Sequence, residues 1–330
     1  MTQNWQGIPV LVTGSGGFIG NKLVETLVEK GARVRAFVRY TSRADTGLMK
    51  LLPAQITENV EIISGDLRDA DAIEQAASGA ELIFHLGALI SIPYSYIHPA
   101  EVVETNIIGT LNVLQACRKF GCRLIHTSTS EVYGTALYVP IDEAHPLQGQ
   151  SPYSASKIGA DKLVESFYRS YDVSAVTVRP FNTYGPGQSA RAVIPTIITQ
   201  ALTQDVILLG NLEAKRDFTY LDDTVDGFIK AAEAESVAGE TFNLGSGAET
   251  DIGELTKSII ELIGRPVSIE IDSNRLRPEK SEVMRLLSDN RKARSLLGWS
   301  PKVETRTGLQ KTITWIREHL DLYRIGKYER

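Results

Sequence analysis

Residues 8–20 read Ile-Pro-Val-Leu-Val-Thr-Gly-Ser-Gly-Gly-Phe-Ile-Gly. The first six residues form a short run rich in Val and Leu, typical of a buried strand, and apolar residues at helical spacing follow from 17 to 30. Three glycines spaced by three therefore lie where a strand ends and a helix begins, which permits a tight turn and close approach of the backbone to a pyrophosphate. Because the helix N-terminus offers free N–H groups, the pattern predicts a dinucleotide site at Gly14, Gly17, Phe18, Ile19 and Gly20.

The same strand and helix unit recurs along the chain. Further strands are expected at residues 33–38, 60–64, 82–86, 123–127 and 174–179. Helices are expected between them, at residues 69–77, 100–120 and 152–171. Alternation of this kind predicts an α/β fold of the Rossmann type, a doubly wound parallel sheet with helices on both faces.

The alternation becomes irregular after residue 179, at the turn-rich stretch Pro-Phe-Asn-Thr-Tyr-Gly-Pro. Helices are expected at residues 192–203, 222–234 and 307–320, among short elements separated by Gly and Pro. We predict a smaller α/β domain that binds substrate, formed by residues 181–216 and 248–330. Residues 1–180 and 217–247 are predicted to form the dinucleotide-binding domain.

Composition excludes several classes of partner. The chain has 35 Lys and Arg against 40 Asp and Glu, a net charge of −5, so there is no electrostatic basis for binding nucleic acid or an anionic membrane. The first residues lack the pattern of a signal peptide, and no stretch approaches the roughly 18 apolar residues of a membrane span, so a cytoplasmic protein is expected. The only cysteines, Cys117 and Cys122, have neither metal-ligand nor disulfide spacing, and no metal is expected.

The end of the second predicted strand bears on the choice of cofactor. Sites that bind the ribose 2′-hydroxyl of NAD usually carry an acidic residue there. Here the sequence reads Arg39-Tyr-Thr-Ser42-Arg43, and the first acid is Asp45. The guanidinium of Arg39, with Ser42 and Arg43 behind it, suits a 2′-phosphate, so the sequence favours NADP over NAD. The alternative is an exposed basic turn that leaves the cofactor to other residues.

Two further strand ends are predicted to contact the cofactor. Asp66 and Leu67 follow the third strand, where a carboxylate can accept a hydrogen bond from the adenine amino group. The alternative for Asp66 is a cap of the next helix, a role that Asp69 can also fill. Close passage of the cofactor is predicted after the fourth strand, at Leu86, Gly87 and Ala88.

Tyr153 and Lys157 are four residues apart in a stretch that Pro152 can open as a helix. Four residues is about one helical turn, so both side chains project from one face. A nearby ammonium group lowers the pKa of a phenol, so Lys157 is predicted to make Tyr153 a general base near neutral pH. An isolated pair of this kind is usually a surface pair, and its significance comes from following a dinucleotide turn.

Hydroxyl groups and one carboxylate follow the strand at residues 123–127. Because ligands bind at the carboxyl edge of open α/β sheets, Thr129, Ser130 and Glu131 are predicted to face the substrate. Thr129 can hydrogen-bond a substrate hydroxyl beside Tyr153, and Glu131 can transfer protons. The alternative is that these residues are turn and N-cap residues without a chemical role.

Together these motifs resemble the extended short-chain dehydrogenases that act on nucleotide sugars. The resemblance covers nearly the whole chain and rests on the glycine turn, the Tyr153 and Lys157 pair, and residues 65–66, 129–131, 179–186, 216–220 and 297–301. It implies that Tyr153 with Lys157 removes the proton of the sugar 4-hydroxyl while hydride passes from C4 to NAD(P).

In the family that the sequence resembles, the residue at the position of Glu131 distinguishes subfamilies. Nucleotide-sugar 4-epimerases usually have small or hydroxyl residues at this position, whereas 4,6-dehydratases and UDP-glucuronate decarboxylases carry the glutamate. Ser130 stands where glucose 4,6-dehydratases typically have Asp, as in the mannose-type sequence Thr-Ser-Glu, so the dedicated acid for the leaving hydroxyl is absent. Glu131 is then implied to take the C5 proton and to assist loss of the C6 hydroxyl, with Ser130 beside it.

Residues 127–136 and 181–195 are most similar to N-acetylglucosamine nucleotide 4,6-dehydratases of the legionaminic-acid type. The implied substrate is UDP- or GDP-N-acetylglucosamine, and the implied cofactor is tightly bound and recycled. The resemblance also implies a homodimer formed through the helices at 100–120 and 152–171. By the same carry-over, the nucleotide diphosphate and ribose are bound by Asn182, Arg191, Arg216, Arg277 and Glu282.

Other functions remain open from the sequence. Within enzymes they are a UDP-glucuronate decarboxylase and a nucleotide-sugar 4-epimerase. From a different class, a catalytically silent NADP-binding regulatory protein would keep the glycine turn but has no need of Tyr153, Lys157 and Glu131 together.

Overall fold

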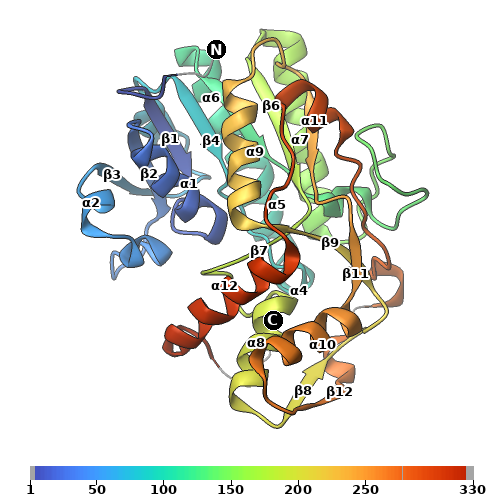
Figure 1. The fold of residues 1–330 in the computed structure, drawn as a ribbon. Coiled ribbons are helices and arrows are strands. Elements are labelled where there is room, and N and C mark those ends of the chain that lie inside the picture. Colours follow the sequence, from blue (N-terminus) through green and yellow to red (C-terminus); the bar gives the residue numbers. More distant parts are fainter. Residues whose placement is uncertain (1–3, 277, 325–330) are drawn as a thin grey trace.

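The computed structural model describes residues 4–276 and 278–324, which form a larger lobe around one sheet and a smaller lobe beside it (Figure 1). All seven strands of the main sheet are parallel. Their spatial order is β10 (Thr241–Leu244), β6 (Ala175–Pro180), β5 (Arg123–Thr127), β4 (Leu82–His85), β1 (Pro9–Thr13), β2 (Arg33–Arg39) and β3 (Val60–Gly65). The predicted strands are confirmed to within about two residues, and the predicted Rossmann-type fold is confirmed.

Helices cover both faces of this sheet (Figure 1). One face is covered by α1 (Phe18–Glu29), α9 (Leu221–Glu233) and α11 (Arg291–Leu297). The other is covered by α3 (Ala70–Ala77), α6 (Gly109–Phe120) and α7 (Pro152–Tyr171). All five residues of β1 are buried, because a strand covered on both sides needs apolar residues throughout, and this is why the run from Ile8 shows no alternation.

The position of the site follows from the strand order. β1 pairs with β2 on one side and with β4 on the other, so the order of the strands reverses between β1 and β4. In open α/β sheets the crevice at such a reversal, outside the carboxyl ends of the strands, binds ligands. The loops after β1, β2, β4, β5 and β6 all meet at this edge.

The smaller lobe contains two short sheets and three helices. One sheet has the strands β11 (Glu249–Asp251), β9 (Lys215–Tyr220) and β7 (Asn182–Tyr184), and the other pairs β12 (Ser268–Ile271) with β8 (Val206–Leu209). The helices are α8 (Val193–Thr203), α10 (Ile252–Ile263) and α12 (Thr305–Glu318). Ile197, Ile259 and Ile313, one from each helix, are fully buried in a core separate from those of the main sheet.

The helix predicted at 100–120 is interrupted. It consists of α5 (Pro99–Val103), a π-helical turn (Glu104–Ile108) and α6, and the short helix α4 (Ile92–Ile97) precedes it. The remaining short elements are α2 (Ala54–Thr57) and 3₁₀ turns at Gly47–Leu51, Ser130–Tyr133, Ser273–Arg275, Glu279–Ser281 and Leu320–Leu322. A π turn of five residues is too short for apolar spacing to distinguish it from the α-helix around it, so the sequence pattern did not show it.

The predicted division into domains stays a prediction, and the packing adds a detail to it. Ala293, Leu297 and Trp299 belong to the same buried cluster as α9 in the larger lobe. Trp299 is fully buried and its Nε1 donates to the backbone oxygen of Asp223 at 2.8 Å. Residues 291–299 therefore pack against the larger lobe, although the sequence pattern placed them with the substrate-binding part.

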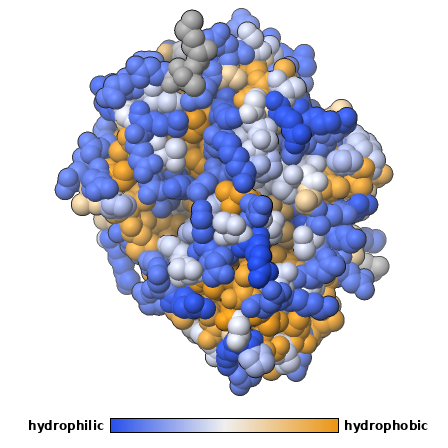
Figure 2. All heavy atoms as spheres, viewed as in Figure 1, coloured by the Kyte–Doolittle hydropathy of each residue, from blue (hydrophilic) through white to orange (hydrophobic). Residues whose placement is uncertain are grey.

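Hydrophilic residues predominate on the face shown in Figure 2, with apolar areas between them, one of which lies over the smaller lobe. Among residues 4–276 and 278–324, no helix has both the length and the apolar character needed to cross a membrane.

Candidate active site

A cavity of about 630 Å³ runs along the carboxyl edge of the main sheet. It is formed by the loops that follow β1, β2, β4, β5 and β6, together with the first turn of α7. Most of the sequence-predicted residues meet here. Those that line the cavity are Gly14, Gly17, Phe18, Ile19, Gly20, Arg39, Leu86, Ala88, Thr129, Ser130, Glu131, Tyr153 and Asn182.

The glycine turn fits a dinucleotide. Gly14 has a φ of +74°, and a Cβ built on it would lie 2.8 Å from the backbone nitrogen of Gly87. A Cβ on Gly20 would lie 2.2 Å from the backbone oxygen of Gly14, so only glycine allows this packing. Helix α1 begins at Phe18 with no side-chain cap and no acidic residue in its first turn. Its free N–H groups and positive dipole end therefore face the cavity, as a pyrophosphate requires.

Only part of the basic turn after β2 lines the cavity. Arg39 lines the cavity, but its side chain is 62% exposed and its guanidinium lies 3.3 Å from the carboxylate of Glu101. Ser42 and Arg43 are exposed and lie outside the cavity lining. Thr41, Asp45 and Thr46 line this end of the cavity instead.

Asp66 does not line the cavity either. Its carboxylate accepts hydrogen bonds from the Arg68 guanidinium at 2.7 and 3.0 Å, and these lower the pKa of Asp66. The capping role belongs to Asp69, whose carboxylate accepts from two backbone N–H groups at the start of α3. Leu67 is buried beneath the loop after β4, where its Cδ1 would be 2.8 Å from a Cβ on Gly87.

Helix α7 brings Tyr153 to the cavity and holds Lys157 one turn behind it, outside the cavity lining. It begins at Pro152, as predicted, and is capped by a reciprocal pair of hydrogen bonds between Ser151 and Ser154. Tyr153 is buried and lines the cavity. Lys157, one turn later, is also buried, and its Nζ donates to the backbone oxygen of Thr127 at 2.6 Å.

The predicted lowering of the Tyr153 pKa by Lys157 stays a prediction, because other groups dominate the pKa of this phenol in the structure. Burial raises the pKa of Tyr153 well above its ordinary value, and the group that lowers it is the hydrogen bond to Thr129. Burial also lowers the pKa of Lys157 to about 8, while the negative charge of Asp161 opposes that effect. The ammonium of Lys157 donates to the backbone at the end of β5. Loss of hydration is therefore the main influence on the pKa of the Tyr153 phenol.

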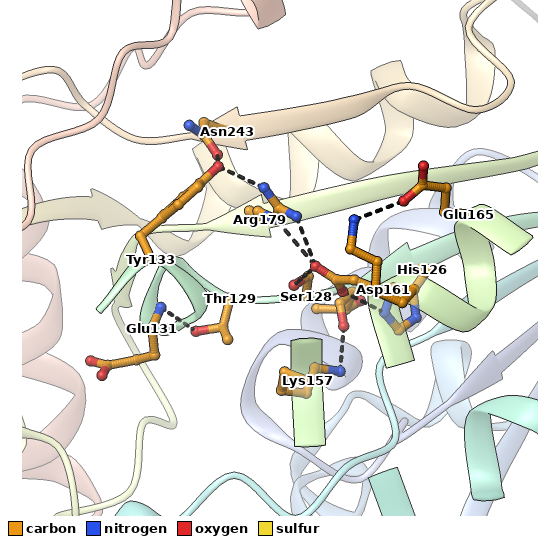
Figure 3. Close-up of polar contacts among 12 residues, drawn as sticks. His126, Ser128, Thr129, Glu131, Tyr133, Lys157, Asp161, Glu165, Arg179 and Asn243 are labelled. Atoms are coloured by element: carbon orange, nitrogen blue, oxygen red, sulfur yellow. Dashed lines mark hydrogen bonds and ion pairs between the residues drawn. The ribbon is translucent and has the colours of Figure 1, made fainter. Parts of the chain in front are cut away.

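Thr129 is an N-cap residue that also lines the cavity, and its contact with a substrate hydroxyl stays a prediction. It is the N-cap of the 3₁₀ turn Ser130–Tyr133, where its Oγ1 accepts from the backbone nitrogen of Glu131 at 3.2 Å, and it also lines the cavity. The carboxylate of Glu131 extends away from Thr129 (Figure 3). Glu131 lines the cavity described above, which is called the cofactor-side cavity because it contains the predicted dinucleotide turn. Glu131 also lines a second cavity in the smaller lobe.

This second cavity, of about 350 Å³, gathers the residues predicted to bind a diphosphate. Arg216 is 8% exposed, and its Nη2 lies 3.5 Å from the carboxylate of Glu282. Asn182 lines both cavities, and its Nδ2 donates to the backbone oxygen of Asp217 at 3.2 Å. Arg191 also lines the second cavity, whereas Arg277 lies outside the described residues.

Two further side chains, Arg275 and Asn106, were not predicted from the sequence. Arg275 lines the second cavity with Arg191 and Arg216, and the only sequence signal was its position two residues before Arg277. Asn106, in the π turn, is buried and bonds both backbone groups of Leu89 as well as the hydroxyl of Ser156. It therefore joins the loop after β4 to helix α7, and a polar residue inside an apolar helical pattern was the available signal.

Comparison with known proteins identifies the family. Residues 11–312 match the family model described as GDP-mannose 4,6 dehydratase. A UDP-glucose 4-epimerase of Mycolicibacterium smegmatis is 34% identical over 93% of this chain and 98% of its own length. A dTDP-glucose 4,6-dehydratase of Actinoplanes sp. is 31% identical over 93% of this chain and 97% of its own length.

The fold agrees with this result. The dTDP-glucose 4,6-dehydratase DesIV of Streptomyces venezuelae, a double mutant solved with NAD bound, is 29% identical and superposes with a TM-score of 0.85, covering 96% of this chain and 99% of that one. The resemblance found in the sequence is thereby confirmed at the level of the family. The chain belongs to the NAD-dependent nucleotide-sugar epimerases and dehydratases of the short-chain dehydrogenase/reductase superfamily.

Proposed function

We propose that the protein is a nucleotide-sugar 4,6-dehydratase, which converts UDP- or GDP-N-acetylglucosamine to the 4-keto-6-deoxy sugar. The observation that carries this proposal is the placement of Glu131. Its side chain lies where the two cavities meet, in the same cavity as Tyr153 and beside the cavity that holds the arginines. A carboxylate at this junction is what removal of the C5 proton requires.

The residues divide the reaction between them. A bound dinucleotide would supply the acceptor for the C4 hydride and the donor of hydride to C6. Tyr153, hydrogen-bonded to Thr129, takes the proton of the 4-hydroxyl as the ketone forms, and Lys157, one turn away, is assigned to stabilise its phenolate. The ketone acidifies the C5 proton, which Glu131 removes. Because Ser130 provides no carboxylic acid, that proton leaves from Glu131 with the C6 hydroxyl as water. As C6 receives hydride, C5 takes a proton from solvent through Glu131, and Tyr153 gives up the 4-hydroxyl proton to solvent.

Arginines on the smaller lobe hold the nucleotide diphosphate in this proposal. Arg191, Arg216 and Arg275 line one cavity, and a planar guanidinium matches the oxygens of a phosphate. Glu282, beside Arg216, is in place to accept from the nucleotide ribose.

The decisive experiment measures the mass of the product. Purified protein is incubated with UDP- and GDP-N-acetylglucosamine, UDP-glucose, GDP-mannose and UDP-glucuronate. Loss of water supports the proposal, loss of CO₂ identifies a decarboxylase, and an isomer of unchanged mass identifies a 4-epimerase. The epimerase is the second candidate because relatives of that name are as similar as the dehydratases. No product from any substrate favours the silent regulatory protein.

For the cofactor we propose NADP in preference to NAD. The support is Arg39, the one residue of the basic turn that lines the cavity. Mass analysis of the nucleotide released from denatured protein tests the choice, and release of NAD alone overturns it.

We also propose a homodimer formed through the run from α5 to α6 and through α7. These elements contact one another and leave Val103, Ile108 and Tyr171 between 40% and 45% exposed, which is unusual for apolar side chains on adjacent helices. Light scattering on the purified protein and on Ile108→Glu tests this: a dimer that the substitution converts to a monomer supports it.

A further inference from the structure

A buried polar network lies behind the cleft, around Asp161 of α7 (Figure 3). Asp161 follows Lys157 by one helical turn and is 5% exposed. Its carboxylate accepts hydrogen bonds from Nε2 of His126 at 3.2 Å and from the Ser128 hydroxyl at 2.8 Å. Two nitrogens of Arg179, at 2.9 and 3.2 Å, complete its partners.

The network continues to the far end of the segment that carries Glu131. Nη1 of Arg179 donates to the phenol oxygen of Tyr133 at 2.9 Å, and that hydroxyl donates to Oδ1 of Asn243 at 2.7 Å. Ser128 begins the segment 128–133 and Tyr133 ends it. One carboxylate is therefore bonded to the start of the segment directly and to its end through Arg179, while Thr129 and Glu131 lie between the two anchors.

We propose that Asp161 is a positioning residue for the reaction: it anchors both ends of segment 128–133 and places a negative charge one turn from Lys157. The inference rests on the proposed function only where turnover is measured. Asp161 touches neither of the two cavities that hold the reacting groups, so its effect is transmitted through its partners.

The groups around Asp161 favour its ionised form. The groups that face it are Lys157 and Tyr153 on α7, His126 on β5 and Arg179 on β6, with Tyr133 beyond Arg179. Burial lowers the pKa of His126, which disfavours a positive charge on this imidazole. Although burial alone would raise the pKa of Asp161, the hydrogen bond from His126 and the charge of Arg179 hold it at about 2. The carboxylate is therefore ionised, and it opposes the lowering of the Lys157 pKa by burial.

A third cavity, of about 520 Å³, reaches Asp161 and Arg179 from outside the cleft. It is also lined by Thr177, Glu165 and Lys292, and it shares no lining residue with the cofactor-side cavity. A small anion can thus approach Arg179 without entering the cleft. This separation makes it possible to replace the carboxylate of Asp161 from solution.

The first test needs no substrate. The ¹⁵Nζ resonance of Lys157, assigned by its absence from Lys157→Arg, is titrated in the wild-type protein and in Asp161→Asn, Asp161→Glu and Glu165→Gln. Asp161→Asn is expected to lower the pKa of Lys157 by about one unit or more, because it removes an opposite charge. Asp161→Glu is expected to keep it. Glu165→Gln is the matched control, since Glu165 lies on the same helix and pairs with Lys162 and Arg169. An unchanged Lys157 pKa in Asp161→Asn overturns the electrostatic role.

The second test measures the anchoring role through turnover. Asp161→Ala is expected to lower kcat about 10- to 100-fold with little change in KM, the factor that corresponds to losing hydrogen bonds to a charged group. Added formate is expected to restore kcat in a saturable manner by binding Arg179 through the third cavity, with no effect on the wild-type enzyme. A folded Asp161→Ala that formate does not restore, or that keeps full kcat, overturns the anchoring role.

The two experiments separate this inference from the proposed function. If no nucleotide sugar loses water but Asp161→Asn lowers the pKa of Lys157, the proposed function fails and the electrostatic role of Asp161 stands. If dehydration occurs and neither the titration nor the formate experiment responds to Asp161, the inference fails and the function stands. Should Asp161→Ala not fold, Ser128→Ala removes one anchor without a charge and is expected to lower kcat while leaving the Lys157 pKa unchanged.

Discussion

The two cavities that meet at Glu131 are suited to phosphates by different means. On the cofactor side, the turn from Gly14 to Gly20 has no charged side chain and presents backbone N–H groups and the end of a helix dipole. On the other side, three arginines line the cavity. The first arrangement depends on glycines, because a Cβ on Gly14 or Gly20 would collide with the backbone. The second depends on charged side chains, and its strength is expected to vary with salt and with the partner of each guanidinium.

The largest effect is expected at Glu131, whose carboxylate side chain lines both cavities. Glu131→Gln removes the proposed base and is expected to lower the rate of water loss about 10²- to 10⁴-fold, without weakening the binding of either diphosphate. Product formation by mass and binding by calorimetry measure the two quantities. Glu165→Gln is the control, because it removes a carboxylate that faces neither cavity. A Glu131→Gln protein with the full rate would exclude the proposed role.

Gly20→Ala tests whether the glycine turn of the cofactor-side cavity binds the dinucleotide. The new Cβ would lie 2.2 Å from the oxygen of Gly14, so the turn must shift, and dinucleotide affinity is expected to fall about 10- to 100-fold. Binding of UDP or GDP to the other cavity is expected to stay within about twofold. Gly79→Ala is a control for a strained alanine away from the site, since Gly79 has a φ of +73° and a Cβ there meets nothing within 4 Å. Normal dinucleotide affinity in Gly20→Ala would show that the turn does not hold the cofactor.

Arg216→Ala tests whether the second cavity, lined by arginines, binds the nucleotide diphosphate. Loss of its guanidinium is expected to weaken binding of UDP or GDP about 10-fold, the factor that goes with one hydrogen bond to a charged group. The salt dependence of this affinity is expected to decrease, while dinucleotide binding is unchanged. Arg306→Ala removes an exposed arginine that pairs with Glu261 and provides the comparison. If both variants bind equally well, the arginine cavity is not the diphosphate site.

The smallest effect concerns pH. Lys157, which is assigned to stabilise the Tyr153 phenolate, is an ammonium below its pKa of about 8 and neutral above it, so turnover is expected to fall by at most about tenfold between pH 8 and pH 9. A profile of kcat from pH 6 to 10 measures this limb. Binding of UDP to the arginine cavity is expected to show no such limb, because guanidinium groups stay charged over this range. A flat kcat profile up to pH 10 would contradict the assignment.

Much of the fold followed from the sequence because its signals were local. The apolar run before Gly14 and Pro152 at the start of α7 placed β1 and α7 to within one residue. Tyr153 and Thr129 were found for the same reason, since each stands at the end of a recognisable element. Their roles at this site remain predictions until the variants are measured.

The structure differs from these expectations where several elements meet. No pattern in the sequence indicated that Arg39 lies beside Glu101, 62 residues away, or that Ser42 and Arg43 are outside the cavity lining. The pKa of Tyr153 was predicted from its neighbour in sequence, but burial by the surrounding loops determines its direction. Desolvation and long-range ion pairs depend on tertiary packing, which spacing along the chain does not report.

The place of β10 in the sheet has a consequence for how the protein is made. β10 pairs with β6, although more than 60 residues separate the two strands, and Trp299 closes the helix layer over them later still. During synthesis on the ribosome, β6 therefore remains an unpaired edge until residue 244 has emerged. Exposed edges of this kind attract other chains, so a polypeptide that stops short of β10 is expected to aggregate rather than to fold as a shorter protein.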